Sequence, residues 1–289
     1  MHPAAASTAI RAEITATCGG RVLAVFAAAL YVRLDDPSAT VLAVVARDGV
    51  RLPNALLVAA AGTDHPFAGH RAGEPAGVDH GVLQVGAVGY RAVRWWTPRR
   101  LAGRADPQVV AGRRDALRRR LDTVPPLEPP VAAAADGLQR ALAERDEYSA
   151  RLAADGLVGL GAGSTPAGDD VLAGVLVACS QLSGLLGTAA VEHLARRLGA
   201  HVRQRAAART TALSATLLRH AARGDAAEPV VGVVAALAGQ RPLDPALDTL
   251  LALGHTSGAD TARGLLAGAG SLLGPVPTFR LRALKCADG

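Results

Sequence analysis

The sequence has few aromatic residues, few cysteines and a single methionine, and these shortages limit what the chain can be. Aromatic side chains make up 3% of the 289 residues, whereas apolar residues as a whole make up 50%. A sizeable core must therefore be built mainly from alanine, valine and leucine. The length allows two domains or one large one.

Cysteine is too sparse to build a disulfide framework or a zinc site. Cys18, Cys179 and Cys286 lie far apart, with no spacing typical of paired metal ligands. The N-terminus also lacks a basic region that leads directly into an apolar segment, which argues against a signal peptide. We therefore expect a cytoplasmic protein.

Lysine is almost absent, since Lys285 is the only one. A Walker phosphate loop needs a lysine after its last glycine, so that class of nucleotide site is excluded. The net charge of +6 comes from arginine, and eight arginines cluster between Arg99 and Arg120. No aromatic residues alternate with them, as a nucleic-acid surface would favour. We expect a helix over residues 111–121 with a solvated face or a subunit contact, and no nucleic-acid partner.

Residues 171–191 contain no charge and are long enough to cross a bilayer. Gln181, two serines and three glycines interrupt the segment, and no basic residues flank it closely. We therefore expect the buried central helix of a soluble domain and no membrane partner.

The residues on either side of the prolines at 125–130 differ in pattern. Residues 1–20 are expected to be a flexible start that leads into a first strand or short helix. Segments 22–34, 40–47, 54–60 and 82–96 are typical of strands between turns. Beyond the prolines, apolar periodicity predicts helices over 132–154, 189–222, 229–239, 242–253 and 260–273, and a last strand around 279–281. The fold class that we expect is α+β, with a mostly antiparallel β domain or small barrel over residues 1–124 and an all-helical domain over residues 125–289.

The most distinctive stretch is GLGAGSTPAGDD at residues 159–170. Its glycines allow backbone angles that a Cβ atom forbids, while Ser164 or Thr165 could cap a helix that begins near Pro166. Free N–H groups at such a helix start can bind an anion, although the glycines could also serve only to let two backbones pass closely. Asp169 and Asp170 could hold Mg²⁺ beside a phosphate or cap the helix.

A second copy of this pattern occurs later in the chain. Residues 168–176 and 258–266 share the pattern G-x-D-x-x-x-G-[VL]-L, and the loop before the second copy holds His255 and Ser257. Two loop-to-helix junctions of one design could face each other across a site. Coincidence is the alternative in a chain so rich in alanine and glycine.

Two further groups of polar residues are candidates for parts of a site. Thr210 and Ser214 are one turn apart in a predicted helix, so their hydroxyls share a face, but bonds back to the backbone are equally expected. The loop at 62–81 holds His70 and Glu74, but its spacing matches no metal-binding pattern. We therefore predict no metal ligands there.

The motifs agree in order with those of a known family. Residues 157–174, LVGLGAGSTPAGDDVLAG, are followed by RTT at 209–211, LRHAARG at 218–224 and GHTSGAD at 254–260. The first of these resembles the signature GLGPGLTPSGDDFLAG of the AllH-like family. Ala162 stands where that family usually has proline and Ser164 where it has leucine, and Pro53 with Asn54 echoes its N-terminal part more loosely.

The resemblance implies a subunit of oxamate carbamoyltransferase, a multi-component enzyme of allantoin and purine catabolism. Such an enzyme converts oxalurate and phosphate to oxamate and carbamoyl phosphate, which implies a small anionic substrate and partner subunits. The reaction needs an anion cradle, a donor to the carbonyl oxygen and an acid for the leaving amide. The resemblance implies no cofactor other than a Mg²⁺ ion, which the aspartates could hold.

The resemblance also places roles on residues of this chain. His255, Asp170 and Asp169 are the catalytic candidates, with His255 as acid or polariser unless it is only a structural hydrogen-bonding residue. Arg209 could pair with a carboxylate of the substrate. The contacts to substrate and phosphate would come from Gly161, Gly163, Ser164, Thr165, Gly168, Arg209, Thr210, Thr211, Ser214, Ser257, Gly258 and Asp260. The alternatives are a non-catalytic scaffold or regulatory subunit, and a Mg-nucleotide or phosphate-binding enzyme.

Overall fold

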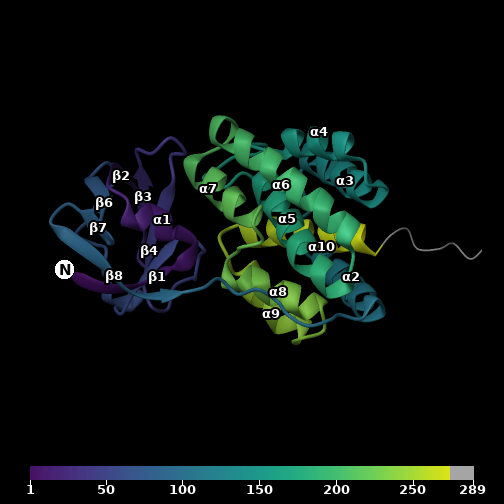
Figure 1. The fold of residues 1–289 in the computed structure, drawn as a ribbon. Helices are drawn as coiled ribbons and strands as arrows, with labels where there is room; N and C mark the ends of the chain where they lie inside the picture. The colour runs from purple at the N-terminus through teal and green to yellow at the C-terminus, as the bar shows by residue number, and fades with distance from the viewer. Residues whose placement is uncertain (274–289) are drawn as a thin grey trace, which may run out of the picture.

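The computed structural model describes residues 1–273, and the strand predicted around 279–281 lies outside them. Figure 1 shows a β-barrel at the N-terminal end of the chain beside a larger body of helices. The expected α+β class, with strands first and helices after, is confirmed.

Within residues 1–273 the sheet consists of eight strands that close into a barrel in the order β1-β5-β4-β3-β2-β6-β7-β8. Closure removes exposed strand edges, because β1 pairs with both β5 and β8. The pairs β1–β8 and β4–β5 are parallel, and the other pairs are antiparallel. The strands are β1 (His2–Ser7), β2 (Cys18–Val25), β3 (Ala29–Leu34), β4 (Val41–Val45), β5 (Ala55–Val58), β6 (Pro75–Asp79), β7 (Val82–Val85) and β8 (Val88–Trp96).

The barrel is filled by aliphatic side chains and one phenylalanine. The 3₁₀ turn η1 (Thr8–Ile10) and helix α1 (Arg11–Thr15) bring Ile10 and Ile14 into this core, beside Leu42 and Phe67. All five residues of β4 are buried, because alternate side chains enter the barrel core while Val45 and its neighbours form a separate cluster on the outer face.

Two expected strands are each divided in the structure, and strand β6 was not predicted. Residues 22–34 form two strands, because the chain turns at Phe26, whose N–H donates to Ala29 O. Residues 82–96 also form two, separated at Gly86, which has a φ of 53°. Residues 1–20, expected as a flexible start that leads into a first strand or short helix, contain β1, which pairs on both sides, and the short helix α1. The sequence does not predict strand β6, because its residues, PAGVD, show little alternation of apolar and polar side chains.

The helices after the barrel also differ from expectation at two points. The helix expected over residues 132–154 is interrupted at Arg145, which takes a left-handed conformation. The helix expected over residues 189–222 is interrupted where Thr211 caps a new helix. The helices are α2 (Pro107–Leu121), α3 (Pro129–Glu144), α4 (Glu147–Leu157), α5 (Ala167–Leu186), α6 (Ala189–Arg209), α7 (Ala212–Ala221), α8 (Glu228–Leu237), α9 (Leu243–Leu251) and α10 (Ser257–Leu272), besides the short 3₁₀ turn η2 (Gly62–Asp64).

Helix α5 lies at the centre of the helical region, in contact with α3, α4, α6, α7, α8 and α10 (Figure 1). By length and composition it could cross a membrane, and 72% of its most apolar window is buried inside the structure. Its lack of charge therefore agrees with its place in the core.

Helices α5 and α10 pack in parallel, with their N-termini at the same end. A Cβ atom on Gly264 would lie 2.0 Å from the carbonyl oxygen of Val171, and one on Gly174 would lie 2.3 Å from that of Thr261. Val171 and Thr261 occupy equivalent positions in the repeated pattern, so the contact is reciprocal. The repeat is thus a structural one, in which two similar junctions lie side by side.

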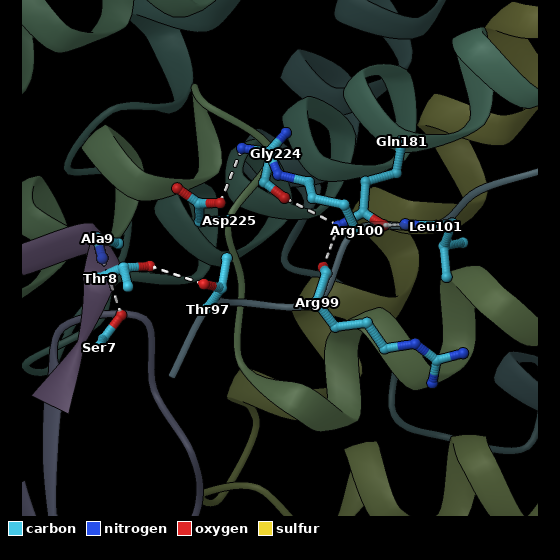
Figure 2. A network of polar contacts seen from close by, with 10 residues as sticks. All are labelled: Ser7, Thr8, Ala9, Thr97, Arg99, Arg100, Leu101, Gln181, Gly224 and Asp225. Atoms are coloured by element: carbon cyan, nitrogen blue, oxygen red, sulfur yellow. Dashed lines mark hydrogen bonds and ion pairs between the residues drawn. The ribbon is translucent and has the colours of Figure 1, made fainter. Parts of the chain in front are cut away.

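Residues 97–106 connect the barrel to α2 and are held by a buried glutamine. Gln181 of α5 donates to Gly224 O at 2.9 Å and accepts from the Leu101 N–H at 3.4 Å, while Arg100 pairs with Asp225 at 2.8 Å (Figure 2). Farther along the chain, Leu117 joins the helical core. By its packing, α2 belongs with the helices; the division of the chain at 124/125 stays a prediction about folding units.

Candidate functional site

A cavity of about 430 Å³ lies between the outer face of the barrel and the helical region. Tyr31 and Val45 contribute to its wall from β3 and β4, and Val177, Leu213 and Leu217 from α5 and α7. Most of the wall is therefore apolar. The cavity exists only because the two parts of the chain pack together.

One end of the cavity is polar and is built by the two equivalent helix starts. Thr165 precedes α5, and Ser257 is the first residue of α10. Their hydroxyl oxygens lie 2.9 Å apart, and both residues line the cavity together with Asp170. The prediction that the two junctions face one site agrees with this geometry.

Asp170 is the buried acid of this polar end. It is 9% exposed, and its Oδ2 has no hydrogen-bond partner among the described residues. Burial raises its pKa to about 8, the negative charges of Asp260 and Asp169 add to the effect, and the hydroxyls of Ser257 and Thr165 oppose it. Asp170 therefore carries a proton at neutral pH.

Asp169 has a different role, although it is the next residue. Its Oδ1 accepts the N–H of Gly159 at 2.8 Å, and its Oδ2 accepts the hydroxyl of Thr210. Burial raises its pKa, and hydrogen bonds from Thr210, Gly159 and Ser214 oppose that change. Both oxygens are occupied by the protein, so Asp169 ties the glycine loop to the end of α6.

The glycine loop itself is shaped by packing. Gly159, Gly161 and Gly163 all have positive φ, and a Cβ on Gly159 would lie 2.2 Å from Arg209 O. The residue that caps α5 is Pro166, not Ser164 or Thr165 as predicted, and it makes no side-chain cap. Residues 161–164 are exposed on the surface.

The expected cradle of free N–H groups at the start of α5 is largely occupied. The N–H of Gly168 donates to Leu160 O at 2.8 Å, and those of Asp169 and Asp170 donate to Pro166 O at 2.9 and 3.2 Å. An anion at this helix start would have to compete with these bonds. The other explanation of the glycines is that they let two backbones pass closely. The close contacts at Gly159 and Gly168 support this explanation.

Hydroxyl groups at the junction between α6 and α7 hold the glycine loop by hydrogen bonds. Thr211 donates to Ser164 O at 2.6 Å and accepts the Ser214 N–H at 3.1 Å. The expected arrangement of Thr210 and Ser214 on one helix face is wrong, because α6 ends at Arg209. The two hydroxyls instead meet at Asp169.

Other candidate residues lie outside the cavity wall. His255 is exposed, and Arg209 pairs with Asp155 at 3.3 Å on the surface. Asp260 is 5% exposed and lies 3.7 Å from Arg263, while Gly258 packs against Leu250 O. The structure thus brings Ser164, Thr165, Asp170 and Ser257 to the cavity and leaves His255 and Arg209 away from it.

The residues present do not fit a Mg²⁺ ion. Asp169 has both oxygens engaged by protein donors, and among residues 1–273 no group of three acidic, histidine or cysteine side chains lies close enough to hold a metal ion. In the barrel loop, His70 contacts Glu74 at 3.1 Å and the Tyr90 hydroxyl at 3.0 Å. That set links the loop to β8.

The barrel's contribution to the cavity was missed by the sequence reasoning. Phe26 and Tyr31 meet edge to face at 5.8 Å and both line the cavity, as does Pro53. The loose family resemblance at Pro53 and Asn54 was the available signal. The sequence alone does not place this wall, because nothing in it says which outer face of a barrel meets a helix.

Comparison with known proteins bears on the helical region. A family model described as oxamate carbamoyltransferase subunit AllH matches residues 157–269. This region is similar to the AllH family. The AllH match runs from the last residue of α4 into α10, so it includes Asp170, Thr165 and Ser257 but none of the barrel wall. No solved structure matches the chain.

Proposed function

We propose that this AllH-type chain is a subunit of an oxamate carbamoyltransferase-type enzyme and that the cavity at Asp170 is its substrate site. The observation that carries the proposal is the buried Asp170, which lines the cavity with the hydroxyls of Thr165 and Ser257 inside the segment that matches the family. We also propose that the protein is cytoplasmic, that it assembles with partner subunits and that its substrate is a small molecule.

The proposed reaction is the phosphorolysis of an acyl urea. A phosphate oxygen forms a bond to the carbamoyl carbon, the bond from that carbon to the oxamate nitrogen breaks, and the nitrogen takes a proton. Asp170 in its acid form is the proposed donor of that proton. The hydroxyls of Thr165 and Ser257 are the proposed donors to the carbonyl oxygen, where negative charge grows.

Phosphate is proposed to approach from the exposed part of the glycine loop, residues 161–164. His255 and Arg209 lie on the surface rather than in the cavity, so we propose them only for contacts with phosphate, with the charged end of a substrate or with a partner subunit. The family's description as a subunit supports the view that other chains complete the enzyme.

The test is phosphate-dependent cleavage of oxalurate by the tagged protein purified from its own host with its partners. Carbamoyl phosphate formation should fall by about 10²–10⁴-fold in Asp170→Asn, because an amide has the shape of the acid but gives up no proton. Asp136→Asn, at an exposed position of α3, is the matched control and should keep full activity. Full activity of Asp170→Asn would overturn the site assignment.

A non-catalytic scaffold is the second candidate, and one observation favours it. The glycines of the loop are explained by close backbone contacts, and the first N–H groups of α5 are already bonded. In that case partner chains hold the chemistry, and the complex stays active when Asp170 is replaced.

A further inference from the structure

We infer that a second cavity, at the end of the barrel, binds a small organic cation with an ammonium or guanidinium head. This barrel cavity measures about 490 Å³ and lies between β1, β5, β8 and the chain at residues 59–74. Figure 1 shows the N-terminus, where β1 begins, on the side of the barrel away from the helices. The inference goes beyond the proposed function, because the barrel cavity lies outside the segment that matches the AllH family.

The charge of the wall is the first observation. Asp64 and Glu74 both line the barrel cavity, whereas no arginine or lysine among residues 1–273 does so. Arg71 precedes Glu74 by three residues, but it is exposed and is not part of the wall. An acidic wall is unexpected in a chain whose net charge is +6. A cation in the barrel cavity would be attracted by two carboxylates, and an anion would be repelled by both.

Glu74 is held in place by its neighbours and keeps one oxygen for a ligand. Its Oε2 lies 3.1 Å from His70 Nδ1 and accepts the Arg71 N–H at 3.3 Å. Burial alone would raise the pKa of Glu74, but the hydrogen bonds and charges of His70 and Arg71 lower it, so the side chain is a carboxylate at neutral pH. Its Oε1 makes no hydrogen bond within the described residues. Gly86 leaves room for this oxygen, because a Cβ atom there would overlap it.

Aromatic side chains are the second observation. Tyr90 is 3% exposed, and its hydroxyl lies 3.0 Å from His70 Nε2, so His70 connects it to Glu74. The ring of His2 lies 5.8 Å from that of Tyr90, with 30° between the two planes, and all four side chains line the barrel cavity. A cation is attracted to the face of an aromatic ring as well as to a carboxylate. The wall therefore combines the two kinds of group that recognise organic cations.

The test compares probes of similar size and different charge. Dissociation constants of n-butylammonium, n-butanol and butyrate would be measured on the purified full-length chain by ligand-observed NMR at low ionic strength. We expect n-butylammonium to bind about tenfold more tightly than n-butanol, and butyrate to bind more weakly than n-butanol. n-Butylguanidinium, which has the same charge on a planar head, should also bind more tightly than n-butanol. An increase of the salt concentration from about 20 to about 200 mM should weaken the binding of the two cations only.

Variants of the two acids test whether the cation lies in the barrel cavity. Glu74→Gln keeps the shape of the side chain and removes its charge, so it should weaken n-butylammonium about fivefold and leave n-butanol unchanged. Asp64 is exposed, and an asparagine there can still accept the Ala61 N–H, which Asp64 accepts at 2.9 Å. Asp64→Asn should therefore fold normally and weaken n-butylammonium about two- to threefold. Asp136→Asn, which removes the same charge from an exposed position of α3, is the control and should bind as the wild type does.

Three results would overturn the inference. The first is equal binding of n-butylammonium and n-butanol, and the second is binding of butyrate as tight as that of the cation. The third is cation binding that both Glu74→Gln and Asp64→Asn leave unchanged, because the cation would then lie elsewhere on the chain. Near-UV circular dichroism checks the fold of Glu74→Gln, and if this variant does not fold, Asp64→Asn and the salt dependence decide. Carbamoyl transfer is not the readout, so the failure of this inference and the failure of the proposed function are distinguishable.

Discussion

Adjacent aspartates in one helical turn have separate tasks because they point to different surroundings. Asp169 accepts hydrogen bonds from Gly159 and Thr210, so its carboxylate is part of the fold. Asp170 lines the cavity and has an oxygen that no described residue satisfies. Replacement of each should therefore affect different properties of the protein.

Replacement of Asp169 should mainly affect stability. Asp169→Ala leaves the Gly159 N–H and the Thr210 hydroxyl without their acceptor, which should lower the free energy of unfolding by about 2–4 kcal/mol. Asp170→Ala removes a carboxyl group whose hydroxyl partners, Thr165 and Ser257, can still bond each other at 2.9 Å, so we expect no comparable loss. Urea unfolding followed by circular dichroism measures both. Equal losses in the two variants would contradict the division of roles.

The pH dependence of stability gives a second test at this scale. Folding raises the pKa of Asp170 from 3.8 to about 8, so between these values the folded chain holds one proton more than the unfolded chain. The stability from this group is complete below about pH 4 and is lost as the pH rises toward 8, by up to about 1.4 kcal/mol per pH unit. Asp170→Asn should lack this loss. If wild type and variant keep a constant difference in unfolding free energy between about pH 5 and 8, Asp170 does not titrate as we infer.

Three candidates from the sequence, Thr165, Asp170 and Ser257, lie at the polar end of the cavity. His255 and Arg209 lie away from it, because a motif can mark a residue as polar but cannot orient its side chain. Whether a side chain enters a cavity depends on the packing of α5, α10 and the barrel, and that information is not local. For the same reason the different roles of Asp169 and Asp170 could not be told apart.

At the scale of elements, the contact between α5 and α10 decides where the polar end lies. Their backbones cross so closely at Gly174 and Gly264 that no side chain fits between them. This approach sets the two helix starts side by side, and it is the condition for the bond between Thr165 and Ser257.

A methyl group at the crossing should therefore be costly. Gly264→Ala should lower the free energy of unfolding by about 1–3 kcal/mol, because its Cβ would overlap Val171 O and force the helices apart. Gly184→Ala, at an exposed and open position of α5, is the control and should be neutral or stabilising by up to about 1 kcal/mol. Thermal unfolding of both variants measures the difference. A tolerated Gly264→Ala would show that the crossing has room to relax.

Helices were easier to predict than strands, for physical reasons. The uncharged segment at α5 and the apolar pattern of α8–α10 located these helices within about five residues, whereas the breaks at Arg145 and Thr210 depend on caps within otherwise helical patterns. Short strands such as β6 have too few residues to show alternation. Barrel closure depends on pairing between distant strands, so the sequence indicated a sheet or small barrel without deciding between them.

At the scale of the whole molecule, the cavity depends on a polar junction between barrel and helices. The hydroxyl of Thr216 on α7 accepts the buried N–H of Val41 at 3.0 Å. Arg219, one turn later, donates to Ser38 O and to the Thr40 hydroxyl. These bonds hold β4, whose outer face forms part of the wall, against α7.

The last prediction asks whether barrel and helices unfold as one unit. Both tryptophans, Trp95 and Trp96, lie on β8, so their fluorescence reports on the barrel, whereas far-UV circular dichroism reports mainly on the helices. Thr216→Val leaves the Val41 N–H without its acceptor and should lower the free energy of unfolding by about 1–3 kcal/mol. Because the junction is extensive, we expect both signals to shift together to lower urea.

The control for this experiment is Thr249→Val on α9, where the hydroxyl is exposed and bonds only to Pro245 O within its own helix. It should leave both transitions near those of the wild type. If Thr216→Val instead shifts the tryptophan signal alone, the barrel unfolds independently of the helices. That result would support separate folding units, and it would mean that the cavity between them can open without loss of the helical core.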